Sequence, residues 1–530
     1  MFRGNEWRWI KIISPILVGL PIILACPTRP LEMPLPQESV VTGKIFPQTL
    51  EKDVDILFVV DNSGSMKEEQ ENLRQNFPKL VEALRSSTLG AEKGLAGAVC
   101  TTGNTTGCAI PNVHIGVISS DLGAGQFGTG SCATSQGDQG RLKNAPQVPG
   151  CTAPNDAYIS YIDGATNVND GNASGVESVK QALACIAELG TDGCGYEHHL
   201  EAAYWALDSN ADRNPGFIRD SALLAIVIIA DEDDCSARLQ NLFDQNNPNL
   251  GPLNFRCFEY GTDCDGKSID RQYRGPLDNC VPKSDEEGYL YPINRYADYF
   301  KGLKEEGRVL FTAIIGPNSP VVVTQDSDGA ALQASCTSAE FGLADPGIRI
   351  KSLVDSFENE GSFTNICEGD FGPAMKALGE QIVGRLGGQC ISAPLLIKGG
   401  ALACKAGDSI GTNSKGEAVT CKSDCLKMAD CKIQQSTGSS GSGSREWENV
   451  ERCSDALFDS TSGDCGTECP CWRIAKKETC VPESVGSPYG LEILREGGKE
   501  PEKGTVANVA CQTSGHKWGS KGLADLPQCQ

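Results

Sequence analysis

The sequence predicts an α/β protein in which a doubly wound, mostly parallel sheet over residues 50–390 precedes a disulfide-rich, mainly β or irregular module over residues 391–530. First, from about residue 50 short apolar runs alternate with amphipathic helical patterns, as in a parallel sheet covered by helices. Second, the run 222–230 is continuously apolar, as expected of a strand buried on both faces. Third, residues 400–530 hold 11 cysteines and little helical periodicity.

The N-terminus reads as a targeting segment. Basic residues precede the apolar run 12–25, which is shorter than an ordinary membrane span and ends at Cys26. The stretch Ile23-Leu24-Ala25-Cys26 resembles a bacterial lipobox, in which the cysteine is lipidated. We therefore expect residues 1–26 to be a lipoprotein-type signal peptide with Cys26 as the anchor. A plain secretory signal and an uncleaved anchor are the alternatives, and each of them also exports the chain.

The next segments follow in order. Residues 27–49 carry five prolines and predict an extended tether. Pro78 should kink or restart the helix in which it falls. Strands are expected at 55–60, 113–120, 222–230, 309–315 and 362–366, and helices near 73–84, 176–186, 200–207, 293–303 and 371–382.

Two long polar insertions, residues 121–170 and 235–288, interrupt this pattern, and each carries cysteines. The chain has 25 cysteines, which in an exported protein favours disulfides over zinc sites. We therefore expect disulfides to staple both insertions. In the C-terminal module, segments 491–494 and 505–509 predict a β-hairpin or small sheet.

Cysteine counting also predicts a link between the two halves. Twelve cysteines lie between Cys100 and Cys367, and 11 lie between Cys404 and Cys529. Because an odd number cannot pair completely, Cys390 most simply pairs with a cysteine of the C-terminal module. The alternatives are an unpaired Cys390 or a bond from Cys390 back into the preceding domain.

Charge excludes one class of partner. The formal net charge is -23, which repels nucleic acid and offers no basic patch to an anionic membrane surface.

Enzyme signatures such as a nucleophile elbow, a phosphate-binding loop or a dinucleotide fingerprint are missing from the sequence. The sequence therefore favours a non-enzymatic protein.

Candidate metal ligands follow the first strand. Asp61, Ser63 and Ser65 are spaced two residues apart, so the turn can direct one carboxylate and two hydroxyls toward a common point. Oxygen ligands of this kind suit hard cations such as Mg²⁺. The strand over 222–230 ends on Asp231, and ligand sites of open α/β sheets lie at the carboxyl ends of their strands.

The stretch Asp61-Asn62-Ser63-Gly64-Ser65 resembles the start of the metal-ion-dependent adhesion site of von Willebrand factor type A domains. Together with the acidic strand end at Asp231, it resembles a group of exported bacterial type A domain lipoproteins. The resemblance implies that Asp231 completes the site. It also implies a threonine before a later helix, but Cys194 stands there. The metal ligand that this threonine supplies in the family would then come from Thr191, from Glu197 or from a water. Glu232 is a second departure, since the family pattern there is closer to Thr-Asp-Gly.

The resemblance implies a divalent cation, Mg²⁺ or alternatively Ca²⁺ or Mn²⁺, that binds a carboxylate of a protein partner. We therefore expect a lipid-anchored binding protein of the bacterial cell envelope. Two alternatives stay open. One is a scaffolding envelope protein in which the metal only stiffens loops, and the other is a hydrolase with an unrecognised site.

Overall fold

The computed structural model of the chain describes most of the sequence beyond residue 38. The described residues are 39–47, 53–86, 89–101, 104–133, 136–145, 148–211, 213–305, 307–338, 342–386, 391, 393–437, 447–460, 464–476, 488–499, 501, 505–516 and 518–529. Cys26 and the signal segment lie outside them, so their assignment stays a prediction.

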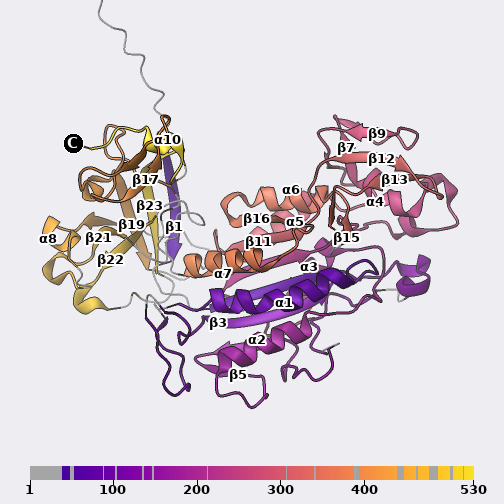
Figure 1. Cartoon of the computed structure of the whole chain (residues 1–530), viewed down its shortest axis with the longest axis horizontal. Coiled ribbons are helices and arrows are strands. Elements are labelled where there is room, and N and C mark those ends of the chain that lie inside the picture. Colours follow the sequence, from indigo (N-terminus) through magenta and orange to yellow (C-terminus); the bar gives the residue numbers. More distant parts are fainter. Residues whose placement is uncertain are drawn as a thin grey trace, which may run out of the picture. The chain divides into compact units, whose positions relative to one another are not determined.

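A seven-stranded sheet forms the centre of the α/β domain (Figure 1). Its order is β16-β11-β6-β2-β3-β4-β5, and the first five of these strands run parallel. Strands β4 and β5 extend one edge in antiparallel pairing. The bounds are β2 Asp53–Val60, β3 Asn112–Ser119, β4 Ile159–Ile162, β5 Ala165–Thr166, β6 Leu223–Ile229, β11 Val309–Ile315 and β16 Gly361–Asn365. The predicted α/β class and the five predicted strands are confirmed.

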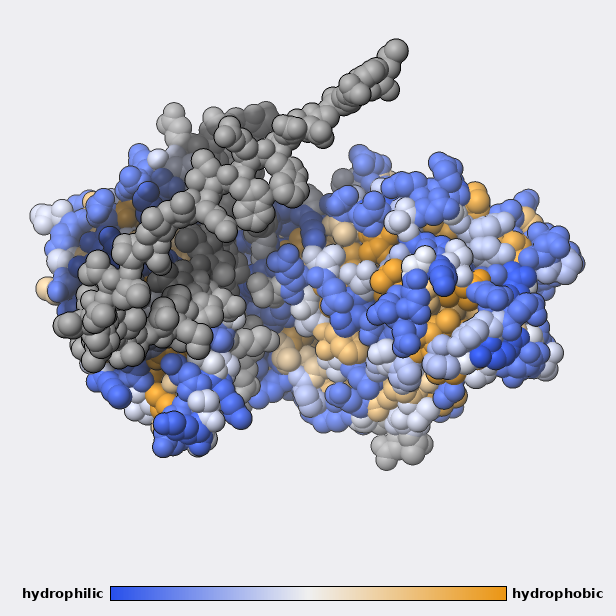
Figure 2. All heavy atoms as spheres, turned by 90° about the horizontal axis from the view of Figure 1, so that it is seen from above, coloured by the Kyte–Doolittle hydropathy of each residue, from blue (hydrophilic) through white to orange (hydrophobic). Residues whose placement is uncertain are grey.

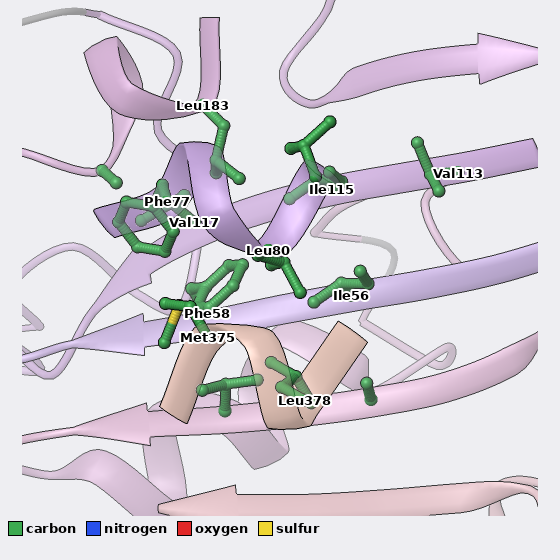
Figure 3. Close-up of a cluster of buried hydrophobic side chains, with 14 of the residues drawn as sticks. Ile56, Phe58, Phe77, Leu80, Val113, Ile115, Val117, Leu183, Met375 and Leu378 are labelled. Atoms are coloured by element: carbon green, nitrogen blue, oxygen red, sulfur yellow. The ribbon is translucent and has the colours of Figure 1, made fainter. Parts of the chain in front are cut away.

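Helices cover both faces of this sheet, because the strands place alternate residues on opposite sides. In β2, Ile56 and Phe58 pack with one set of helices, whereas Leu57 and Val59 pack with the other set. Figure 3 shows the first layer, where Phe77 and Leu80 of α1 and Met375 of α7 meet Phe58. The first set comprises α1 Lys67–Ala83, α2 Gly175–Ile186 and α7 Gly372–Leu386, and the second comprises α3 His199–Leu207, α5 Ile293–Gly302 and α6 Ile348–Ser356.

Helix α1 does not restart at Pro78, although a restart is one of the two outcomes expected there. The helix continues without a break from Lys67 to Ala83 with Pro78 inside it. Proline removes one backbone hydrogen bond, but Phe77, Leu80 and Val81 beside it are fully buried against the sheet. Burial of this apolar face therefore outweighs the local cost.

Both insertions fold into small stapled structures. Residues 235–288 form α4 and four short strands, β7 to β10, and residues 121–170 supply β4 and β5 to the central sheet. Four further short strands, β12 to β15, lie between residues 321 and 344. Their bounds are α4 Leu253–Gly261, β7 Thr262–Cys264, β8 Lys267–Ser268, β9 Gly275–Leu277, β10 Val281–Pro282, β12 Val321–Gln325, β13 Ala330–Gln333, β14 Cys336–Ser338 and β15 Gly342–Ala344.

The C-terminal module contains a six-stranded sheet of order β1-β23-β19-β20-β21-β22. The two segments predicted as a hairpin or small sheet, in β22 and β23, lie in this one sheet but do not pair with each other. The bounds are β17 Ser409–Thr412, β18 Ala418–Thr420, β19 Cys431–Thr437, β20 Glu448–Arg452, β21 Cys471–Lys476, β22 Tyr489–Leu494, β23 Thr505–Ser514, α8 Asp455–Phe458 and α10 Lys521–Ala524.

Strand β1, Ser39–Pro47, corrects the predicted tether. We expected an extended linker over residues 27–49, but residues 39–47 pair antiparallel with β23 from Ser39↔Ser514 to Pro47↔Val506. The segment contains Val40, Val41, Thr42 and Ile45, β-branched residues that favour strands. The C-terminal module is therefore not continuous in sequence, because the α/β domain is inserted between its first strand and the rest.

Eleven disulfides link described cysteines, six in the α/β domain and five in the C-terminal module. All 12 cysteines from Cys100 to Cys367 pair among themselves, and the insertions are stapled as expected. Disulfides persist in oxidising compartments, so the cysteine usage indicates an exported protein. Within the described part of the chain, no helix has the length and apolar character needed to cross a membrane.

Polar residues predominate on the face shown in Figure 2, where hydrophobic areas are separate from one another. Among the described residues, the large hydrophobic side chains that are exposed lie on different segments, at Val99, Tyr273, Val281, Leu343 and Met428. Scattered exposed apolar side chains are normal for a water-soluble surface.

The disulfide count sharpens the prediction for Cys390, which lies outside the described residues. In the C-terminal module, ten of the 11 cysteines pair with each other, which leaves Cys480, also outside the described residues. We expect non-reducing peptide mapping to recover Cys390 joined to Cys480, since the two would complete the pairing. A bond from Cys390 to any cysteine before Cys367, or an alkylatable Cys390 thiol, would show that this link does not exist.

Candidate metal centre

The two predicted ligand-bearing strands are direct neighbours. Val60 of β2 lies opposite Ile229 of β6 in parallel register, so both strands end at the same edge of the sheet. The backbone N–H of Asp61 donates to the carbonyl of Ile229 over 2.9 Å. Strand order reverses at β2, whose partners β3 and β6 lie on opposite sides. Open α/β sheets bind ligands beside such a point.

Hydrogen bonds link three of the four predicted ligands, Asp61, Ser63 and Ser65, and Asp231 lies beside them. The backbone N–H of Ser63 donates to Oδ1 of Asp61 over 2.8 Å. The hydroxyls of Ser63 and Ser65 are hydrogen-bonded at 3.1 Å. The Ser65 hydroxyl lies close enough to the Asp231 carboxylate to lower its pKa. The structure therefore brings these four side chains together at the carboxyl ends of β2 and β6.

Gln70 of α1, which the sequence did not single out, fixes the position of the first loop. Its Nε2 donates to the carbonyl of Asp61 over 2.8 Å and to that of Gly190 over 3.0 Å. Its Oε1 accepts the backbone N–H groups of Leu189 and Gly190. One buried amide thus holds the Asp61 turn against the loop that precedes α3.

A glycine allows this second loop to approach closely. The N–H of Gly193 donates to the carbonyl of Asn62 over 2.9 Å, and a Cβ at Gly193 would lie 2.3 Å from Oδ1 of Asn62. The next residue, Cys194, is fully buried and disulfide-bonded to Cys132. A disulfide sulfur cannot replace the threonine hydroxyl that the type A pattern has there.

His199 is the second residue missed from the sequence. Its Nε2 lies 3.2 Å from Oδ2 of Asp61, and both side chains are fully buried. Burial lowers the pKa of His199, but the hydrogen bond to Asp61 and nearby negative charges outweigh it, so the pKa is raised overall. The imidazole therefore offsets part of the Asp61 charge.

Two of the acidic residues after β6 have structural roles. The Asp233 carboxylate accepts the backbone N–H groups of Arg349 and Ile350 at the start of α6. Asp234 pairs with the Arg349 guanidinium at 3.0 Å and also accepts the N–H of Leu200 in α3. Both carboxylates thus accept backbone N–H groups in the first turn of a helix, which leaves Asp231 and Glu232 for other roles.

Glu197 and Glu232 form a carboxyl pair beside the predicted ligands. The interaction between the two carboxyls raises the pKa of Glu197 and lowers that of Glu232, so it favours a proton on Glu197. Burial, followed by the charges of Glu232 and Asp61, raises the pKa of Glu197 well above its usual value. Thr191 is only half-buried, and among the described residues no hydrogen bond links its hydroxyl to Asp61 or Asp231. Of the two candidates for the missing threonine, Glu197 lies near the site.

The crowded carboxylates show strongly raised pKa values. Burial, and then the charges of Asp61 and Glu232, raise the pKa of Asp231 to about 8. Burial is also the main cause for Glu69 and Asp345, whose pKa values are each raised to about 7. Burial and neighbouring negative charges therefore both disfavour the ionised form of these carboxyls.

Several buried polar atoms around the site have no hydrogen-bond partner among the described residues: Asp231 Oδ1, Glu197 Oε1, Glu69 Oε2 and His199 Nδ1. A bound cation would satisfy such oxygens, and carboxylate and hydroxyl oxygens suit Mg²⁺ or Ca²⁺. No cluster of three or more His, Cys, Asp or Glu side chains in the described ranges is arranged to hold a metal ion. Of the predicted ligands, only Asp61, Asp231 and the candidate Glu197 are side chains of these types, because the other donors are hydroxyls.

Comparisons with known proteins add little. No protein-family model matches the chain, and no curated protein matches it. Among solved structures, the conserved hypothetical protein BatB from Bacteroides thetaiotaomicron is 10% identical, with 63% of this chain and 98% of that chain covered and a TM-score of 0.25. The human COPII-coat protein Sec24c is 8% identical, with 89% and 42% covered and a TM-score of 0.23. Likenesses this weak establish neither a family nor a function.

Proposed function

We propose that the chain is an exported, non-enzymatic binding protein whose α/β domain is of the von Willebrand factor type A kind. A divalent cation held by Asp61, Ser63, Ser65 and Asp231 would recognise an acidic group of a protein partner. The observation that carries the proposal is the convergence of the hydrogen-bonded Asp61, Ser63 and Ser65 on a buried, unpartnered oxygen of Asp231. Mg²⁺ is the first choice of cation, with Ca²⁺ and Mn²⁺ as alternatives.

The residues of the site have different roles in this proposal. Asp61 and Asp231 supply charge, and the two neutral hydroxyls leave the cation only partly neutralised, so it can still attract a carboxylate. Gln70 and the Cys132–Cys194 disulfide fix the two loops before any partner arrives. Lipidation at Cys26 would anchor the protein in the bacterial cell envelope, and the acidic surface argues against nucleic acid as partner.

A second function is favoured by the Glu197–Glu232 pair. If both carboxyls ionise near the cation, four carboxylates outweigh its two positive charges, and the cation then attracts no further acid. In that case the metal stiffens the loops of a scaffolding envelope protein, and the cysteine-rich module makes the contacts.

Peptide binding with and without chelator separates the two functions. We expect Asp-containing peptides immobilised on a sensor to bind the exported chain when Mg²⁺ is present. This binding should disappear when EDTA removes the cation. Matched peptides with Asn in place of Asp should not bind. Cation-dependent thermal stability without any Asp-dependent binding would instead establish the scaffolding role. Identical melting curves in Mg²⁺, Ca²⁺, Mn²⁺ and EDTA would contradict both, since a cation at 100 times its Kd stabilises by about 2.7 kcal/mol.

A further inference from the structure

A cavity of about 370 Å³ lies next to the candidate metal centre but includes none of its four predicted ligands. Its walls come from three places: the segment after β3 that contains Phe127, helix α3 with Trp205, and the segment after β6 that contains Gln240 and Asn241. Tyr291, just before α5, completes the lining. This volume falls in the range of small-molecule sites.

The walls of this cavity are held together before any ligand binds. His198 joins all three, because its Nε2 donates to the carbonyl of Gly123 over 3.1 Å and its Nδ1 accepts the N–H of Ala237 at 3.4 Å. Burial lowers the pKa of His198 to about 4, so the ring is neutral, as this bonding requires. The disulfides Cys132–Cys194 and Cys235–Cys257 fix the adjoining loops. A preformed site loses little conformational entropy on binding.

The charged groups in the walls are already compensated. Glu201 accepts hydrogen bonds from Arg295, from the Tyr296 hydroxyl and from Nε1 of Trp205. The Arg238 guanidinium donates to the carbonyls of Gly288 and Glu287 and lies 3.7 Å from the Glu287 carboxylate, which compensates its charge. Neither charge requires a counter-ion from a ligand, so the cavity suits an uncharged molecule.

The cavity wall also offers an aromatic ring held in a fixed orientation and side-chain amides that are available to bind a ligand. Trp205 is half-buried, and its orientation is set by the 2.9 Å bond to Glu201 and by Arg213, whose guanidinium lies 4.6 Å over its ring. Among the described residues, the exposed amides of Gln126, Gln240 and Asn241 have no hydrogen-bond partner. The Gln240 amide lies close over Gly125, where a Cβ would be 1.9 Å from its Oε1.

We propose that this cavity binds a neutral carbohydrate, one or two pyranose rings in size. A pyranose has apolar C–H faces that pack on aromatic rings and many hydroxyls that both donate and accept hydrogen bonds, as amides do. An acidic ligand would meet the chain's net charge of -23, and a purely apolar ligand would leave the amides unpaired. The proposal is independent of the metal centre.

Titration with neutral sugars in EDTA tests this proposal. The probes are glucose, galactose, mannose, N-acetylglucosamine and their common disaccharides, followed by calorimetry and tryptophan fluorescence. We expect at least one to bind. The double variant Gln240→Ala/Asn241→Ala should weaken it at least about tenfold. Trp205→Phe, which keeps an aromatic ring, should weaken it less than Trp205→Ala.

The matched control is Gln333→Ala, an exposed amide on β13 far along the chain from the cavity, which should bind sugar like the unmodified protein. Because Gln240 and Asn241 are exposed, their replacement should leave the melting temperature unchanged, so that a loss of binding reports on the cavity itself. No binding by any sugar of the panel would overturn the proposal. Binding that the double variant leaves unaltered, or binding that disappears in EDTA, would overturn it equally.

Discussion

Replacing Asp61 with alanine is expected to abolish divalent cation binding while the α/β domain stays folded. Asp61 is the only carboxylate of the first loop, and its two oxygens hold the Ser63 backbone and face His199. Without the Asp61 carboxylate, the neutral hydroxyls of Ser63 and Ser65 have no neighbouring negative charge on their loop to attract the cation. Calorimetry should show Mg²⁺ affinity at least about 100-fold weaker, which corresponds to about 2.7 kcal/mol.

Two further variants keep this experiment decisive. Asp61→Asn preserves the shape and the hydrogen bond from Ser63, so a comparable loss of affinity in Asp61→Asn isolates the charge. Asp298→Ala removes an exposed carboxylate on α5 and should bind Mg²⁺ like the unmodified protein. Equal Mg²⁺ affinity in Asp61→Ala and the unmodified chain would refute the assignment of this site.

Replacing Arg349 with methionine is expected to destabilise the α/β domain by about 3–5 kcal/mol, because it leaves the buried Asp234 carboxylate without its cation. Arg349 is 1% exposed, and its Nη2 donates to Asp234 at 3.0 Å and to the Tyr291 carbonyl at 2.8 Å. The pair connects the end of β6 with α6. Urea unfolding in EDTA measures the loss without any contribution from a bound cation.

Adding Asp234→Asn to Arg349→Met should recover part of that stability, since the uncompensated charge is then gone while an oxygen remains to accept the Leu200 N–H. Lys376→Ala is the surface control. Lys376 is 67% exposed in its ion pair with Glu380, and its loss should change stability by less than about 0.5 kcal/mol. An Arg349→Met domain as stable as the Lys376→Ala domain would mean that the buried pair contributes nothing.

Local patterns predicted most of the α/β domain, because its strands are apolar runs and its helices have one apolar face. The run 222–230 became β6, buried along its whole length, and the stripe from Phe371 to Ile382 marked α7. The helix did not restart at Pro78, because burial on the sheet outweighs one lost hydrogen bond. The apolar pattern of a single helix or strand indicates which of its faces is buried, but not which other element packs against that face.

Pairing across long sequence distances could not be predicted in this way. Residues 39–47 read as a proline-bounded tether, yet they pair with β23, more than 450 residues later. The same limit applies to the candidate metal centre. Spacing identified Asp61, Ser63, Ser65 and Asp231, but nothing local indicated that Gln70 would hold the Asp61 carbonyl, or that His199 would face Asp61.

Crystals grown with Mn²⁺ would test the central claim most directly, by anomalous scattering. Our account predicts an anomalous peak within coordination distance of Asp61 and Ser65, at the carboxyl ends of β2 and β6, with Ser63 and Asp231 bound directly or through a water. The peak should be absent from Asp61→Ala crystals. Fully occupied Mn²⁺ elsewhere on the chain with none between Asp61 and Asp231, or no Mn²⁺ at all, would contradict the account.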